Sequence, residues 1–238
     1  MVATAYGLDE AAYHTPGEIP WSDLPERCII QIHWPYGEAL ETQLQAEGFR
    51  TLVLCRHPFD LLISVLQFAG HEPLTARWLG GMAGDESSIV GKSPRSEAFH
   101  QYCLSDRAAA LLAVSREWWC RSSICPVKYE KLVDDPAIEF ARIALFLGAE
   151  LSAEGIQTTV ANNSIEALRA TSANNHFWKG CPGLWRLVIP TTHRDDLFEL
   201  YRPNFATFGY DQGRSTHALA HLDSHEADRN WQLLNRSC

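Results

Sequence analysis

The chain has no long hydrophobic run. Nowhere in its 238 residues does the sequence approach the roughly 20 consecutive apolar residues that a helix needs to cross a bilayer. Residues 1–10 also lack the basic flank followed by an apolar stretch that marks a signal peptide. We therefore expect a cytoplasmic protein that has no membrane partner.

Positive charge is scarce as well. The chain carries 20 Lys and Arg against 29 Asp and Glu, which gives a formal net charge of −9. This balance argues against non-specific nucleic-acid binding, which needs a basic surface. It does not exclude a small anionic ligand, because a pocket can be locally positive on an acidic protein.

Metal-binding cysteine patterns are missing too. The seven cysteines are an odd number, none forms a Cys-x-x-Cys pair, and the spacing of Cys120 and Cys125 fits no common zinc motif. We therefore expect no metal cofactor, and we expect most of the cysteines to be buried and reduced.

Internal repeats and low-complexity tracts are also absent. A chain of 238 residues suits one large domain better than two small ones. We assign residues 1–238 to a single domain, in which residues 1–26 and 214–238 are peripheral segments. The polar tail after Gly213 is predicted to be frayed until Trp231.

What the middle of the chain does contain is an alternation of short apolar runs and helical patterns. The runs predict buried strands at 27–34, 50–55 and 125–129, and the helical spacing of 36–48 makes the first two strands a parallel βαβ unit. Further helices are predicted from Pro58 onward, over 98–122, 137–147 and 192–202, and within 152–170. Residues 70–97 are predicted to be a long loop or lid with one helical turn, and Glu130–Pro136 a turn. The alternation predicts an α/β fold.

Arg56 and Ser64 form the first candidate site. Arg56 closes a predicted strand, and Ser64 follows about two helical turns into the next helix. A guanidinium and a hydroxyl near a helix start suit a phosphate group. The alternative is that Arg56 forms a structural ion pair, for example with Asp60, and that Ser64 is a surface residue.

His33 ends the preceding predicted strand. Ligands of open parallel sheets bind outside the carboxyl ends of the strands, and His33 and Arg56 would end neighbouring strands on that edge. Histidine is the commonest general base, because its ordinary pKa lies near neutrality. The alternative is a packed histidine at a strand end.

Two further segments carry candidate residues. Tyr129 ends the third predicted strand, and it is as readily part of a structural strand and turn as of a site. Lys179 and Gly180 lie in the loop HFWKGCPGLW, residues 176–185, whose flexible amides and one cation could wrap a phosphate. The alternative is a surface turn with aromatic anchors.

These segments, in this order, resemble the cytosolic sulfotransferase family over roughly residues 27–210. RTLVLCRHPFDLLISVLQFA is similar to the family's 3′-phosphate-binding strand, turn and helix. QIHWPY resembles the segment with the family's catalytic histidine, and VKYEKLVDDPAIEFARIALFLG resembles the segment with a tyrosine near the adenosine. NSIEALR resembles the segment that borders the adenine, and HFWKGCPGLW resembles the loop that closes on the 3′-phosphate.

The resemblance implies a P-loop-NTPase-like three-layer sandwich, with a central parallel sheet flanked by helices. It implies 3′-phosphoadenosine 5′-phosphosulfate (PAPS) as co-substrate and His33 as the catalytic residue. The residues that it implies for nucleotide binding are Arg56, Ser64, Tyr129, Ser164, Ile165, Trp178, Lys179 and Gly180.

Three features depart from the family pattern. The glycine-rich and Ser/Thr-rich loop that holds the 5′-phosphosulfate has no match in residues 1–32. Trp178 stands where the family loop usually has Arg, and Gln31 where a Lys is common. Fewer cations would weaken both phosphosulfate binding and the stabilisation of charge during transfer.

The sequence therefore predicts a sulfotransferase that moves a sulfuryl group from PAPS to the hydroxyl or amine of a small-molecule or carbohydrate acceptor. A homodimer is a further possibility that the sequence does not decide. The alternative is a catalytically impaired nucleotide-binding or interaction protein derived from such an enzyme. A third hypothesis is that the given start lies inside a longer reading frame that encodes the phosphosulfate loop.

Overall fold

The computed structural model describes residues 1–70, 86–171, 177–210 and 222–236. Its strands form two parallel pairs. Strand β1, Asp9–Tyr13, pairs with β2, Cys28–Ile32, and β3, Thr51–Cys55, pairs with β4, Ile124–Lys128. The predicted α/β fold, with parallel strands flanked by helices, is confirmed.

The pairing of the strands differs from the prediction. Within the described residues, β2 pairs with β1 and not with β3, so His33 and Arg56 do not end neighbouring strands. Strand β1 was not predicted, because it begins with two exposed acidic residues, Asp9 and Glu10, and lacks an apolar run. Strand β2 is half-buried rather than buried, because β1 covers only one of its edges.

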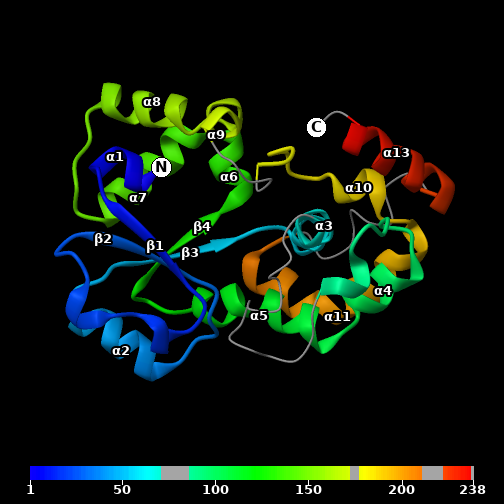
Figure 1. The fold of residues 1–238 in the computed structure, drawn as a ribbon, viewed down its shortest axis with the longest axis horizontal. Helices are drawn as coiled ribbons and strands as arrows, with labels where there is room; N and C mark the ends of the chain where they lie inside the picture. Colours follow the sequence, from blue (N-terminus) through cyan, green and yellow to red (C-terminus); the bar gives the residue numbers. More distant parts are fainter. Residues whose placement is uncertain (71–85, 172–176, 211–221, 237–238) are drawn as a thin grey trace.

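The β3–β4 pair lies between two layers of helices (Figure 1). On one side, Val53 and Ile124 pack with Leu40 of α2, Glu38–Ala46, and with Trp118 of α5, Asp106–Trp119. On the other side, Cys125 and Val127 pack with Phe140 and Ile143 of α7, Pro136–Phe146. Because successive strand residues point to opposite faces, the apolar residues of one strand supply both layers.

The largest apolar cluster surrounds α3, Pro58–Ala69. Apolar residues at 59, 62, 63 and 66 give this helix a continuous buried face. The face packs against α4, Glu97–Cys103, against α5, and against α11, Thr191–Phe208.

The remaining described helices are α1, Val2–Tyr6; α6, Tyr129–Asp134; α8, Ala153–Asn162; α9, Ile165–Thr171; α10, Trp185–Val188; and α13, Ser224–Arg236. Short 3-10 turns cover Pro16–Glu18, Trp21–Asp23 and Glu86–Ile89.

Several predicted boundaries were wrong. The helix predicted over 98–122 is divided into α4 and α5, because the Ser105 hydroxyl accepts a hydrogen bond from the Ala108 amide and starts a new helix. Tyr129 begins α6 instead of ending a strand, so the predicted turn at Glu130–Pro136 is mostly helical.

The two least regular predicted segments are described only in part. In the tail, helix α13 begins at Ser224, so the chain is ordered earlier than Trp231. Of the loop predicted over 70–97, residues 71–85 lie outside the described residues, and Glu86–Ile89 forms a single 3-10 turn.

Candidate functional site

The turn between β3 and α3 carries Arg56. Pro58 opens α3, and the His57 side chain caps the helix, because its Nδ1 accepts a hydrogen bond from the Phe59 amide at 3.3 Å. The His57 ring stacks on Trp185 at 4.9 Å. Burial among these rings lowers the pKa of His57 to about 3, with further lowering from the Arg186 and Arg56 charges. A neutral, packed His57 therefore fixes the turn at which Arg56 leaves the strand.

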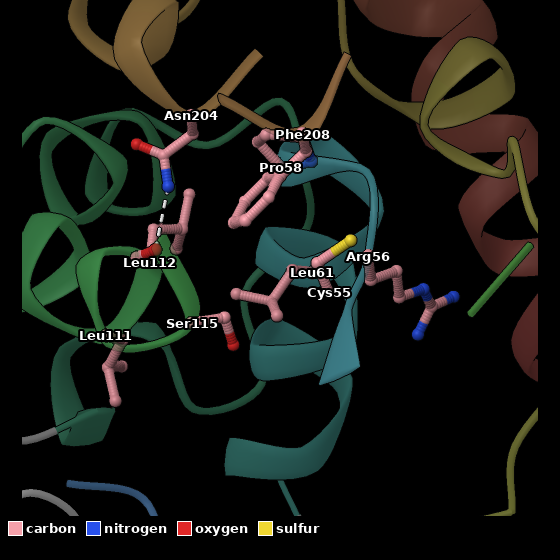
Figure 2. Close-up of a pocket in the computed structure, with 9 residues that line it drawn as sticks. All are labelled: Cys55, Arg56, Pro58, Leu61, Leu111, Leu112, Ser115, Asn204 and Phe208. Carbon is pink, nitrogen blue, oxygen red and sulfur yellow. Dashed lines mark hydrogen bonds between the residues drawn. The ribbon is translucent and has the colours of Figure 1, made fainter. Parts of the chain in front are cut away.

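The guanidinium of Arg56 lies over the ring of Tyr129, with 4.5 Å between Cζ and the ring centroid. Both residues come directly after their strands, since Cys55 and Lys128 are paired in register. Figure 2 shows the guanidinium extending away from the other residues that line a small cavity of about 20 Å³, among them Leu61 and Ser115. The guanidinium is therefore presented at the carboxyl end of the β3–β4 pair.

Arg56 Nε is buried and has no hydrogen-bond partner among the residues that the structure describes. A buried charged donor without an acceptor is uncommon in native proteins, because desolvation without a hydrogen bond is costly. An anion is the chemistry that would satisfy it. The alternative hypothesis of an Arg56–Asp60 ion pair finds no support among the described residues, where the Asp60 carboxylate is engaged elsewhere.

Asp60 anchors the Lys179 loop, residues 177–185, to the first turn of α3. Its side chain is 1% exposed, and its two oxygens accept hydrogen bonds from the amides of Gly183, at 2.5 Å, and Trp185, at 3.0 Å. Burial raises the pKa of Asp60, while these amides and the charge of Arg56 act in the opposite direction. Asp60 thus connects the Arg56 turn directly to the loop that carries Lys179.

A second contact fixes the middle of the Lys179 loop. Gly180 has a φ of +68°, and a Cβ at this position would lie 3.2 Å from the Ile165 side chain. Ile165 begins α9, which Ser164 caps by accepting a hydrogen bond from the Ala167 amide at 3.2 Å. The predicted residues Ser164 and Ile165 are therefore next to the loop, and only glycine suits position 180.

The other predicted residues lie around the same end of the β3–β4 pair. Ser64 is half-buried on α3, one turn beyond Asp60 and on the same face of the helix. Burial raises the pKa of Tyr129, and the charge of Arg56 opposes this. Lys179 Nζ lies 6.0 Å from the Trp178 ring centroid.

One residue that supports this site was not singled out from the sequence. The Glu130 carboxylate accepts hydrogen bonds from the His57 amide, at 2.8 Å, and from the Tyr210 hydroxyl, at 2.6 Å. Glu130 thereby ties the start of α6 to the Arg56 turn and to the end of α11. Its place directly after Tyr129 was the only available signal, and a glutamate in a short helix is ordinarily a surface residue.

His33 occupies a different place. It follows β2, and since Tyr13 pairs with Ile32, His14 and His33 come directly after paired residues of two parallel strands. His14 Nδ1 lies 3.6 Å from a Glu18 carboxylate oxygen. Within the described residues, no hydrogen bond, ion pair or ring contact joins His33 to Arg56, Tyr129 or Lys179.

The pKa of His33 lies below its ordinary value. The main cause is desolvation of the imidazolium by the surrounding protein, although part of the residue is exposed, and the charge of His14 adds to it. A neutral imidazole is the form that can accept a proton, so this environment keeps His33 competent as a base to lower pH.

We therefore expect a pH effect from His14→Gln. Removing the His14 charge should raise the pKa of His33, since a nearby positive charge disfavours protonation. In a profile of kcat/KM against pH, the acidic limb should lie below pH 6.5 in the wild type and at higher pH in the variant. An acidic limb unmoved by the substitution would show that His14 does not act on the titrating group.

Asp60→Asn should destabilise the fold and loosen the Lys179 loop. An asparagine retains one acceptor oxygen, so one loop amide would face an NH₂ group and lose its hydrogen bond. We expect a loss of about 2 kcal/mol in the free energy of unfolding, measured by urea titration. The exposed Asp195→Asn on α11 is the matched control and should leave stability within about 0.5 kcal/mol. Equal midpoints for the two variants would contradict the anchoring role.

The described part of the chain contains neither a metal-binding cluster nor a helix that could span a membrane. No group of three or more His, Cys, Asp or Glu side chains there is arranged to hold a metal ion. No helix in those residues combines the length and the apolar character required to cross a bilayer.

Comparison with known proteins bears on the family and the fold of the chain. The sulfotransferase domain family matches residues 17–209. A solved structure of mouse sulfotransferase SULT7A1 complexed with 3′-phosphoadenosine 5′-phosphate (PAP) is similar to this chain, with a TM-score of 0.65 and 15% sequence identity. The match covers 91% of this chain and 82% of that one. A search of curated protein sequences found no match.

Two structures of retinol dehydratase, both containing PAP, are also similar. The complex with androsterone has a TM-score of 0.56 at 20% identity, and the complex with retinol 0.53 at 19%. They cover 80% and 77% of this chain, which spans 57% and 55% of theirs. At these low sequence identities, the structural matches show a shared fold. Since the family match covers most of the chain, the protein belongs to the sulfotransferase family.

Proposed function

We propose that the chain binds PAPS at the carboxyl end of the β3–β4 pair and transfers its sulfuryl group to an acceptor hydroxyl or amine. The observation that carries this proposal is the buried Arg56 Nε, which has no acceptor in the described part of the chain and belongs to the guanidinium that lies over the Tyr129 ring. A ribose-linked phosphate would supply that acceptor in a charge-assisted hydrogen bond.

The proposed grip on the 3′-phosphate uses groups from two connected segments. Arg56 would donate its fork of N–H groups and Ser64 its hydroxyl, while Lys179 and the Gly180 amide would close from the loop. Asp60 supports this arrangement, because it fixes the loop to the helix that carries Ser64.

The adenosine would occupy the neighbouring surface. Tyr129 offers a ring next to the Arg56 guanidinium, and Ser164 with Ile165 lies against Gly180 of the loop. Trp178 offers a second ring in the loop itself. These groups provide stacking area and a few polar atoms, which is the usual composition of a nucleotide-base site.

His33 is the proposed general base. When bound, PAPS supplies the sulfuryl group and leaves as 3′-phosphoadenosine 5′-phosphate (PAP). His33 would take the proton of the acceptor as the acceptor oxygen or nitrogen bonds to sulfur, and its lowered pKa keeps it neutral for that purpose. Small-molecule acceptors are favoured, since the similar retinol dehydratase structures contain retinol or androsterone.

Calorimetry with PAP tests the proposal first, followed by transfer of labelled sulfuryl from PAPS to a panel of phenols, alcohols, amines and sugars. Adenosine 5′-monophosphate is the matched control ligand, because it lacks only the 3′-phosphate. We expect PAP to bind at least about 100-fold more tightly, given two or more charge-assisted hydrogen bonds. Equal affinities would contradict the phosphate site, and PAP binding without turnover of any acceptor would favour a nucleotide-binding protein without sulfotransferase activity.

A further inference from the structure

Helix α13 lies outside the residues that match the sulfotransferase family, which end at 209. It is nevertheless part of the packed structure. It lies beside α10 (Figure 1), and Ala227 on its inner face is fully buried. Asn230 donates a hydrogen bond to the Leu187 carbonyl at 2.8 Å, and Asp228 pairs with Arg95 at 3.2 Å. The helix therefore has defined contacts on two sides.

One side chain of α13 reaches the Lys179 loop. The Trp231 ring meets the Trp178 ring edge to face, with 5.5 Å between centroids and an interplanar angle of 61°. Trp178 is the residue directly before Lys179, and it is half-buried although it belongs to a loop. Both tryptophans pack against the main apolar cluster around α3.

The contact completes the support of the loop. Asp60 holds its C-terminal part and Ile165 lies against Gly180 in its middle. At the start, the Phe177 carbonyl accepts a hydrogen bond from Arg169 Nε at 2.7 Å, and Trp231 packs on the adjacent Trp178. The aromatic ring of Trp178 gains a partner of matching shape in Trp231.

We infer that Trp231 of α13 is a positioning residue for nucleotide binding: it holds Trp178, and through it Lys179 and Gly180, in the place that grips the 3′-phosphate. The inference rests on the proposed function. It assigns to α13 a role that begins beyond the matched family domain, and it connects this role to the one loop position at which Trp replaces the family's usual Arg.

Calorimetry with PAP on Trp231 variants tests the inference. We expect Trp231→Ala to weaken PAP binding about tenfold, which is the loss expected from one aromatic pair and its preorganisation. Trp231→Phe should bind within about twofold of wild type, because a smaller ring still packs against Trp178. Gln232→Ala, which changes the exposed neighbour on the same helix, should have no effect.

A double-mutant cycle separates positioning from a general loss of stability. If Trp231 acts through Trp178, then Trp231→Ala should cost no further PAP affinity in a Trp178→Ala background. Additive losses, or wild-type affinity in Trp231→Ala, would overturn the inference. A wild type that fails to bind PAP at all would instead overturn the proposed function, so the two failures are distinguishable.

Discussion

Replacing His33 with alanine is expected to lower kcat by about 10²–10⁴-fold, because the acceptor would lose its general base. PAP affinity should not change, since PAP lacks the sulfuryl group beside which His33 would act. The measurement is transfer of labelled sulfuryl from PAPS to an acceptor that the wild type turns over, together with calorimetry of PAP binding.

The matched control is His225→Ala, which removes an exposed histidine of α13 and should retain wild-type turnover. Equal rates for the wild type and His33→Ala would remove His33 from the mechanism. Because His33 is not in contact with the Arg56 site in the described residues, the two halves of the proposal can fail independently.

Arg56→Ala should abolish measurable PAP binding or weaken it by at least about 100-fold, because each charge-assisted hydrogen bond to a phosphate contributes about 1.5–3 kcal/mol. The PAP affinity of Arg56→Lys should lie between those of the wild type and Arg56→Ala, since lysine keeps the charge but lacks the planar fork of N–H donors. The free energy of unfolding should fall by no more than about 1 kcal/mol, because the variant loses the contact with the Tyr129 ring but no hydrogen bond of Nε among the described residues.

The chain offers a close control for this variant. Arg121 also lies over a tyrosine ring, with 3.6 Å between its Cζ and the Tyr36 centroid, but it follows the end of α5. Arg121→Ala removes the same charge and the same kind of ring contact, and PAP affinity should be unchanged. Equal losses in both variants would show a general charge effect rather than a phosphate site.

The Arg56 turn was predictable because it is local. A β-rich run, a polar residue and a proline at the start of an apolar helical pattern specify strand, turn and helix within about 20 residues, with no contribution from the rest of the chain. The order of motifs then identified the family, which the match over residues 17–209 bears out. The roles of the predicted site residues remain a proposal.

The support of the site was not predictable in the same way. From the sequence, Asp60 was considered only as an ion-pair partner of Arg56. In the structure, its oxygens accept hydrogen bonds from amides more than 120 positions away in the chain. The role of Glu130 was not predicted, because its partners are a backbone amide and a tyrosine hydroxyl that only folding brings near. Hydrogen bonds to backbone amides that are distant in the chain leave no residue pattern from which to infer them.

The sequence alone determined most of the longer helices, three of the four described strands and the turn that presents Arg56, since periodicity and helix capping act over one or two turns of chain. Only the tertiary structure decided which strands pair, how the Lys179 loop is anchored, and that α13 packs beside it. Such contacts depend on which apolar surfaces remain exposed once the helices and strands have formed. Many different sequences can bury these surfaces, so the contacts cannot be inferred from residue patterns alone.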